Sequence, residues 1–213
     1  MRTIMTLNAK GGCGKSTLAT NLAAYYAQRG KTVALADFDP QGSSLGWLEA
    51  RSPDRPPIQG IAAYEGPVRP ARDTEVLIID APARSHEKEL TALVRRAESV
   101  LVPVLPSPMD IRAASRFVVE LLLVGKVERK ESKVAVVANR VRENTLIYAK
   151  LQTFLGNLGV PFVGTLRDTQ NYVRAAERGL GVHELAPSLA WQEVEQWEPI
   201  LRWLNSRRSR ASA

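Results

Sequence analysis

The chain has 213 residues, a hydrophobic fraction of 45% and a charged fraction of 24%, and these values exclude extensive disorder and allow one α/β domain with a sizeable core. Its single cysteine, Cys13, excludes an internal disulfide. The net charge of +7 favours a polyanionic partner, with nucleic acid as the natural candidate, although a merely basic surface explains the charge equally well.

The order of the segments predicts one domain over residues 1–206, followed by a flexible basic tail over residues 207–213. The first apolar run begins within a few residues of Met1, so no signal peptide is expected. No later apolar run approaches the ~20 residues of a membrane span. We therefore expect a cytoplasmic protein.

A glycine-rich turn joins an apolar run at residues 3–7 to a helical run at residues 18–28. Gly11, Gly12 and Gly14 lack a Cβ, so the backbone of the turn can take positive φ and aim successive N–H groups at one point. The positive end of the following helix dipole adds to the attraction for an anion. The turn therefore suits a phosphate chain.

Two side chains complete this predicted phosphate-binding loop. Lys15 would reach the β- and γ-phosphates of a nucleotide, and the Ser16 hydroxyl would ligate Mg²⁺. The predicted nucleotide-binding residues of the turn are Gly11, Gly12, Cys13, Gly14, Lys15, Ser16 and Thr17. A glycine-rich turn that binds no nucleotide is disfavoured, because the glycines, the lysine and the serine all fall at the required offsets between a strand and a helix.

The loop departs from the usual pattern G-x-x-x-x-G-K-[ST], because Ala9 replaces the first glycine and Lys10 follows it. Lys10 to Thr17 resembles K-G-G-x-G-K-[ST]-T, the deviant Walker A motif of the ParA/MinD ATPase family of P-loop NTPases. The resemblance implies ATP and Mg²⁺ as cofactors and a homodimer that encloses the nucleotides. It also implies that Lys10 crosses the dimer interface to the partner's nucleotide, so Lys10 and Lys15 are predicted catalytic residues.

An acidic segment follows a buried strand expected at residues 32–38. Asp37 and Asp39 lie two residues apart on an extended chain, so their carboxylates point to the same side. In isolation, an acidic turn closed by Pro40 and Gly42 is the better interpretation, but the neighbouring phosphate loop reverses that preference. The segment resembles the family's D-x-D-P-Q-G, which implies that Asp39 positions the attacking water and that Asp37 supports the magnesium shell or the loop.

The apolar run from Val76 to Asp80 has the Walker B arrangement, in which a buried parallel strand delivers one carboxylate to the metal side of a phosphate loop. Asp80-Ala81-Pro82 resembles the family's D-x-P. The alternative is an ordinary aspartate at the end of a strand. The predicted metal ligands are Ser16, Asp37 and Asp80.

Strand and helix signals alternate along the rest of the chain. Further strands are expected at residues 58–62, 99–105, 134–138 and 160–166, and helices at residues 44–50, 87–97, 111–124, 146–158 and 168–178. This alternation predicts an α/β fold with a mostly parallel, doubly wound sheet and helices on both faces. The nucleotide is expected at the carboxyl edge of the strands.

Asn139 directly follows the strand expected at residues 134–138. In the family an asparagine at this place reads the adenine edge, which requires a donor and an acceptor. Alternatively, Asn139 caps the turn. Backbone groups after Leu166 are expected to border the purine, which makes Arg167 a further nucleotide-binding candidate.

The last part of the chain predicts a helix that docks onto the sheet. Val194, Trp197, Leu201 and Leu204 share one face, and Pro199 is expected to bend or interrupt the helix. Three acids on its polar side argue against a MinD-type membrane anchor. They are Glu193, Glu195 and Glu198.

Exposed arginines are the candidates for contacts with partners. The predicted DNA-backbone patch comprises Arg174, Arg178, Arg202, Arg207, Arg208 and Arg210. Each arginine could instead be simply solvated, as could Arg112 and Arg116, which are possible contacts of a partner protein. His86 and His183 are expected to be surface residues.

The resemblance implies an ATP-driven switch of the small ParA type. It would bind ATP, dimerise, hold DNA nonspecifically on the nucleoid, and hydrolyse ATP slowly until a separate adaptor stimulates it. Its cargo would be a plasmid, a chromosome region, or a protein assembly such as a carboxysome or a chemotaxis cluster. Three alternatives stay open: a MinD-like membrane switch, an ATP-dependent enzyme acting on a small molecule, and a structural nucleotide binder.

Overall fold

The computed structural model describes residues 1–83, 87–125 and 133–209. Seven parallel strands form one sheet in the order β3-β2-β4-β1-β5-β6-β7. The strands are β1 (Arg2–Thr6), β2 (Val33–Asp37), β3 (Ile58–Ala62), β4 (Val76–Asp80), β5 (Ser99–Val104), β6 (Val134–Val141) and β7 (Phe162–Arg167). The expected parallel α/β fold is confirmed.

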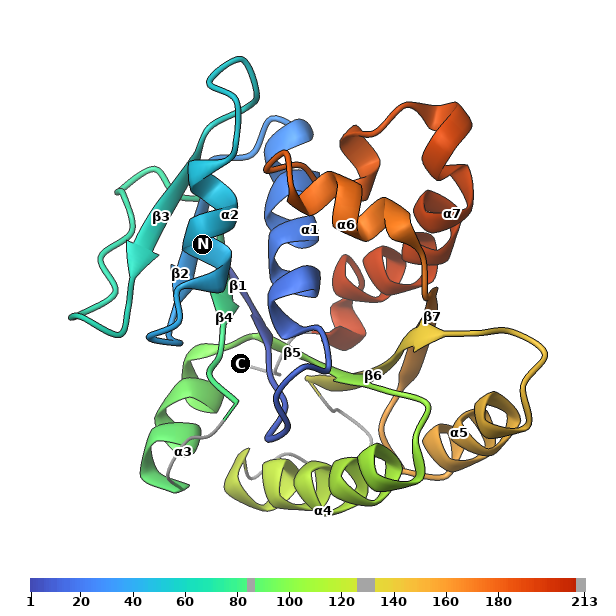
Figure 1. The fold of residues 1–213 in the computed structure, drawn as a ribbon. Coiled ribbons are helices and arrows are strands. Elements are labelled where there is room, and N and C mark those ends of the chain that lie inside the picture. The colour runs from blue at the N-terminus through green and yellow to red at the C-terminus, as the bar shows by residue number, and fades with distance from the viewer. Residues whose placement is uncertain (84–86, 126–132, 210–213) are drawn as a thin grey trace.

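Helices cover both faces of the sheet (Figure 1). The helices are α1 (Lys15–Gln28), α2 (Ser43–Glu49), α3 (Glu87–Arg96), α4 (Pro108–Gly125), α5 (Leu146–Gly156), α6 (Gln170–Ala176), α7 (Pro187–Leu204) and the short 3₁₀ helices η2 (Val182–Glu184) and η3 (Arg207–Ser209). α3, α4 and α5 pack on one face, and α1, α2, α6 and α7 pack on the other. In the described chain, no helix has the length and apolar character needed to cross a bilayer.

Alternating side chains of the central strands supply the two cores. In β4, Leu77 and Ile79 join the core under α3, α4 and α5, whereas Val76 and Ile78 join the core under α1 and α7. A strand buried on both faces reads as a continuous apolar run, which is why the run from Val76 to Asp80 was recognisable in the sequence.

The C-terminal residues that the structure describes belong to the folded domain. Ser209 is buried, and its hydroxyl accepts a hydrogen bond from the Arg2 guanidinium at 2.8 Å. The same guanidinium donates to the carbonyl of Leu204 at 3.0 Å. Residues 207–209 therefore do not form the expected flexible tail, and residues 210–213 lie outside the described part of the chain.

The break in α7 lies at Ala190, where φ is −124° and ψ is 17°, and not at Pro199 as expected. Pro199 lies on the exposed side of the helix. Proline has no N–H to donate to the carbonyl one turn earlier, but on the exposed side water can donate to that carbonyl instead. The helix therefore continues through Pro199.

Candidate nucleotide site

The glycine-rich turn forms a compact loop that ends at the first residue of α1. Gly12 and Gly14 have φ values of 75° and 97°, in the left-handed region that favours glycine. Gly11 does not share this conformation, so positive φ was wrongly expected there. Because Gly14 is the N-cap residue and has no side chain, it leaves the first N–H groups of α1 open to an anion.

The two lysines of the loop occupy different environments. Lys15 is only 7% exposed, and its Nζ donates to the carbonyl of Lys10 at 3.3 Å. The Lys10 side chain is 38% exposed, and its Nζ lies 2.7 Å from Oδ2 of Asp110 in the first turn of α4. Lys15 therefore belongs to the inside of the loop, and Lys10 to its rim.

Asp110 is a site residue that the sequence interpretation missed. Its side chain is buried, pairs with Lys10 and accepts a hydrogen bond from the Ser107 hydroxyl. Its backbone N–H donates to the same hydroxyl at 3.1 Å. Ser107-x-x-Asp110 before an apolar helix is a capping-box pattern that was readable in the sequence, but the contact with Lys10 was not.

Asp80 lies at the end of β4, level with Asp37 of β2 and Thr6 of β1. It is 1% exposed, and within the described residues neither carboxylate oxygen has a hydrogen-bond partner that meets normal geometry. Burial raises its pKa to about 7, and the Asp37 charge adds to this effect. Ser16 and Lys15 act against it and lower the pKa. An orphaned carboxylate beside Ser16 fits a magnesium site, because oxygen ligands suit that ion.

The two carboxylates after β2 have different partners. Asp37 is buried, and its Oδ2 accepts hydrogen bonds from the backbone N–H and the hydroxyl of Ser44 at 3.0 and 2.8 Å. Its Oδ1 accepts from the N–H of Asp39 at 2.9 Å. Asp39 is half-buried, and its Oδ1 accepts from the N–H of Gln41 at 3.0 Å. In these contacts Asp37 holds the segment between β2 and α2, and the expected roles of Asp37 and Asp39 toward the phosphate loop, the metal and the water stay predictions.

A cavity of about 420 Å³ opens beside the loop at the carboxyl ends of β6 and β7. Its size falls within the range of small-ligand pockets. Its lining comprises Gly12, Gly14, Thr17, Asn139, Arg140, Arg167, Asp168, Thr169, Gln170, Tyr172, Val173, Ala176 and Glu177. The fold thus brings together the loop, Asn139 and Arg167, as expected. Tyr172 and Val173 were missed, because nothing in their local sequence marks them as cavity residues.

Asn139 lies inside β6 rather than after it. Its Nδ2 donates to the carbonyl of Cys13 at 2.8 Å, and the residue is 3% exposed. The strand continues through a bulge at Arg140, which has a φ of 52°. Neither expected role of Asn139 included this contact with the phosphate loop.

Arg167 reaches the cavity but is anchored on α7. Its Nε lies 3.0 Å from Oε1 of Glu193, and its guanidinium also contacts Gln192. Glu193 is 1% exposed and accepts from the amide of Asn171 at 3.1 Å. Glu193 was expected on the polar side of the helix, but it is buried and has partners from two other elements, Arg167 of β7 and Asn171 of α6. Glu195 and Glu198 are exposed.

The arginines of the predicted DNA patch do not lie together. Arg174 lies on α6, which the amide of Asn171 ties to the carbonyl of Leu189 in the N-terminal part of α7, and Arg178 follows α6 directly. Arg202, Arg207 and Arg208 are exposed at the opposite end of α7. The rise of a helix puts these ends about 20 Å apart. The described members of the predicted patch therefore form two groups on the chain, their contact with DNA stays a prediction, and Arg210 lies outside the described residues.

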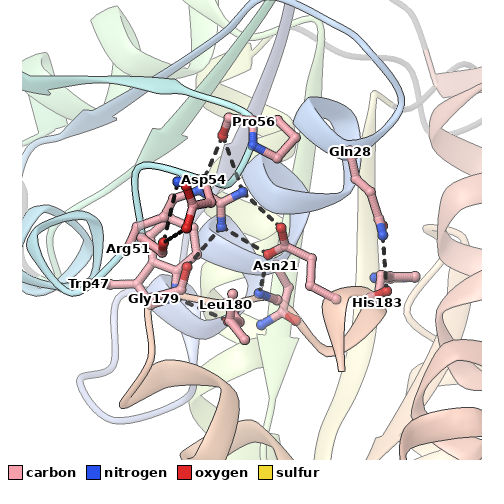
Figure 2. Close-up of polar contacts among 12 residues, drawn as sticks. Asn21, Gln28, Trp47, Arg51, Asp54, Pro56, Gly179, Leu180 and His183 are labelled. Atoms are coloured by element: carbon pink, nitrogen blue, oxygen red, sulfur yellow. Dashed lines mark hydrogen bonds and ion pairs between the residues drawn. The ribbon is translucent and has the colours of Figure 1, made fainter. Parts of the chain in front are cut away.

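A buried ion pair fastens the segment after α6 to α2 (Figure 2). Arg51 donates to both carboxylate oxygens of Glu184 at 2.8 and 2.9 Å, and to the carbonyl of Gly179 at 2.8 Å. Trp47 of α2 donates to the carbonyl of Leu180 at 3.2 Å. These contacts hold in place the end of the helix that lines the cavity.

Asn21 of α1 makes a second connection to this segment (Figure 2). Its Oδ1 accepts from the N–H of Val182 at 2.8 Å, and its Nδ2 donates to the carbonyl of Thr17 at 2.8 Å. The end of the phosphate loop and the segment after α6 are therefore linked through α1. Sequence reasoning missed these residues, since they are far apart in the chain.

His183 is not the surface residue that was expected. Its ring packs between those of Tyr25 and Trp197, with centroids 5.0 and 5.9 Å away. Both ring nitrogens are shielded from solvent and have no hydrogen-bond partner among the described residues. Burial, together with the nearby Arg29, lowers the pKa of His183 to about 4. His86 lies outside the described residues.

A glycine-rich loop between β1 and α1, an orphaned carboxylate on the neighbouring β4 and a cavity at the carboxyl edge of a parallel sheet together define a P-loop nucleotide-binding protein. Residues 4–182 match the family model described as the CobQ/CobB/MinD/ParA nucleotide binding domain. The chain belongs to this family.

Known relatives resemble the chain over most of its length. It is 30% identical over 191 residues to the maintenance of carboxysome distribution protein A of Halothiobacillus neapolitanus, covering 86% of this chain and 87% of the relative. Its fold is similar to that of apo McdA from Cyanothece, with a TM-score of 0.74, 16% identity and coverage of 94% and 99% of the two chains. A putative plasmid partition protein from Borrelia burgdorferi, bound to AMPPNP, gives a TM-score of 0.72, 15% identity and coverage of 94% and 98%.

Proposed function

We propose that this protein is a ParA-like ATPase that binds ATP with Mg²⁺, dimerises around the nucleotides, and uses hydrolysis to position a cargo on DNA. The single observation that carries the proposal is the pair of lysines in one phosphate loop. Lys15 is buried inside the loop, whereas Lys10 is at its rim with a partly exposed side chain. Lys15 already serves the phosphate chain of its own subunit, so the amine of Lys10, once released from Asp110, can contact the nucleotide of another subunit.

The residues around the loop have distinct roles in the proposed reaction. Lys15 and the N–H groups of the loop hold the phosphates, and Lys10 of the other subunit neutralises charge that develops during phosphoryl transfer. Asp39 orients the attacking water. Ser16 and Asp80 would hold Mg²⁺, with Asp37 as support, and the ion would supply charge neutralisation at the β- and γ-phosphates.

The comparisons support a protein assembly as the cargo. The relative from Halothiobacillus neapolitanus, which is 30% identical over most of both chains, is named for the distribution of carboxysomes. We therefore favour a carboxysome or a similar assembly over a plasmid or a chromosome region. A separate adaptor would link this cargo to the ATPase and stimulate hydrolysis.

Nonspecific DNA is the proposed track for the dimer. The chain carries a net charge of +7, and exposed arginines lie on and directly after α6 and at the C-terminal end of α7. Dimerisation doubles the number of available phosphate contacts, and affinity for DNA multiplies with each contact. A dimer that forms only with ATP would therefore bind DNA only with ATP, at the nucleoid.

Retention on DNA tests this proposal against its alternatives. The wild type should bind DNA-coated beads with Mg-ATP and elute with ADP, whereas Lys10→Ala should fail to bind in either case. Lys31→Ala is a matched control, because Lys31 is also a partly exposed lysine in an ion pair of 2.7 Å, with Glu75. Equal DNA binding with and without ATP in the wild type and in Lys10→Ala would contradict the switch. ATP-dependent binding to liposomes instead of DNA would favour the MinD-like alternative.

A further inference from the structure

Asn139 extends from β6 to the phosphate loop. Its Nδ2 donates to the carbonyl oxygen of Cys13 at 2.8 Å. A carbonyl can only accept a hydrogen bond, so the orientation of the Asn139 amide is fixed by its partner. The bond crosses from β6, the sixth strand of the sheet order, to the loop that follows β1, and 126 residues separate the two groups in the sequence.

The same amide nitrogen also packs against Gly14. A Cβ built on Gly14 would lie 2.1 Å from Nδ2 of Asn139, so the amide occupies the space that any side chain at this position would need. Gly14 is the N-cap residue of α1 and has a φ of 97°. Asn139 therefore contacts two consecutive residues at the point where the loop becomes a helix.

We propose that Asn139 is a positioning residue, which holds the phosphate loop in its anion-binding shape before any nucleotide arrives. The proposal rests on the proposed function, because that function assigns the loop to ATP. The hydrogen bond from Asn139 fixes the direction of the Cys13 carbonyl and, because the peptide is planar, the opposite direction of the Gly14 N–H, so the loop keeps a shape whose N–H groups can bind an anion. Loss of the amide would release this constraint and weaken binding of the phosphate chain.

This role differs in its consequences from reading the adenine edge. A residue that reads adenine changes the preference between ATP and GTP, and it does not affect a ligand that lacks a base. A residue that holds the loop changes the affinity for all of these ligands by the same factor. Inorganic tripolyphosphate is the ligand that separates the two roles.

Cys13 supplies a test that requires no nucleotide. It is the only cysteine of the chain, it is buried, and burial raises the pKa of its thiol. In the wild type, Ellman's reagent should therefore react with it slowly. In Asn139→Ala and in the isosteric Asn139→Asp, which lacks the donor, local opening of the loop should raise the rate about tenfold.

Asn171→Ala is the matched control for this experiment. Asn171 is also a buried asparagine whose amide donates to a backbone carbonyl at 2.8 Å, but that carbonyl belongs to Leu189 in α7. The control should react at the wild-type rate. Unchanged reactivity in both folded Asn139 variants would overturn the proposal, as would an equal increase in Asn171→Ala.

Titration with Mg-ATP, Mg-GTP and magnesium tripolyphosphate completes the test. Both Asn139 variants should lose about fivefold to tenfold in affinity for all three ligands, with an unchanged ratio of ATP to GTP affinity. Unchanged affinity for tripolyphosphate, with a fall for ATP alone, would overturn the proposal in favour of adenine reading. If the wild type bound none of the ligands, the proposed function would fail, and the thiol reaction would still decide whether Asn139 holds the loop.

Discussion

Nζ of Lys10 lies 2.7 Å from Oδ2 of Asp110, so the lysine at the rim of the phosphate loop is paired within its own chain. For Lys10 to contact a nucleotide on another subunit, this ion pair must break. Asp110 is held in place by the Ser107 hydroxyl and is buried, whereas the Lys10 side chain is 38% exposed. The lysine is therefore the partner that moves.

Removing the charge of Asp110 should favour the proposed dimer. An ion pair of this partial exposure contributes up to about 1 kcal/mol, so Asp110→Asn should tighten ATP-dependent dimerisation by up to about fivefold. Sedimentation velocity across a concentration series with Mg-ATP measures this constant. Glu75→Gln, which releases the equally close Lys31, is the control and should have no effect. A dimer weakened by Asp110→Asn would instead give Asp110 a role within the interface.

The Asp80 carboxylate should make the metal-free protein less stable as the pH rises. Its pKa is about 7 in the folded state and 3.8 in the unfolded state. Between these values the folded protein keeps a proton that the unfolded chain has lost, so the free energy of unfolding falls with increasing pH. The free energy of unfolding of Asp80→Asn, relative to that of the wild type, should therefore rise by a few kcal/mol between pH 4 and pH 7.

Urea unfolding of the two proteins in EDTA measures this difference. It should grow up to about pH 7 and stay constant above it. At pH 8, addition of Mg-ATP should make the wild type more stable than Asp80→Asn, because only the wild type keeps the predicted metal ligand. A difference that does not depend on pH would show that Asp80 is ionised at pH 4 in the folded protein.

His183 should have the opposite effect on the pH dependence. Its pKa is about 4 in the folded state and 6.5 in the unfolded state. Below pH 6.5 the imidazole of His183 binds a proton in the unfolded chain but not in the folded protein. Acidification from pH 6.5 to pH 4 therefore destabilises the wild type. His183→Phe keeps a ring between Tyr25 and Trp197 and removes two unsatisfied nitrogens.

The variant should therefore be more stable than the wild type by about 2 to 3 kcal/mol at pH 4, and by less at pH 7. Thermal unfolding at pH 4, 5, 6 and 7 follows this difference, and Tyr64→Phe, at an exposed position, is a neutral control. The pH ranges over which His183 and Asp80 affect stability overlap. Each variant should therefore show more clearly the pH dependence of stability that the other group causes. A constant difference across these pH values would contradict the buried, neutral state of His183.

The ion pair between Arg51 and Glu184 should be costly to break on one side only. Its side chains are 5% and 0% exposed, so Glu184→Gln or Arg51→Met should destabilise the protein by about 3 to 5 kcal/mol, because each leaves a buried charge unpaired. The double variant Arg51→Met/Glu184→Gln, which leaves no unpaired charge, should recover part of this loss. Denaturant unfolding of all four proteins gives the coupling energy. Additive effects in this cycle would mean that the two charges do not interact.

Features encoded by local patterns were predictable from the sequence. The bounds of β3 and β4 match the expected ranges, since turn residues and a continuous apolar run mark them. The loop from Lys10 to Thr17 was predicted as a unit for the same reason. Its glycines, lysine and serine have fixed offsets that depend only on the strand and helix on either side.

Features that depend on distant partners were not predictable. The pairs formed by Lys10 with Asp110 and by Arg51 with Glu184 span 100 and 133 residues, and no local periodicity reports them. Glu193 and His183 were expected at the surface because of their residue types, but partners from other elements bury Glu193 and shield the ring nitrogens of the half-buried His183. The arrangement of the candidate arginines was not predictable either, because it depends on how α6 and α7 pack and not on composition.

The mass of the protein in Mg-ATP tests the central claim most directly. Asp39→Ala should bind ATP without hydrolysing it, so its dimer should accumulate, and sedimentation velocity should show a single species of twice the 23.4 kDa of the chain. Adding Lys10→Ala to this variant should return the species to the mass of one chain while ATP binding persists. A monomer in Asp39→Ala with saturating Mg-ATP, or a dimer that is indifferent to Lys10→Ala, would contradict the account.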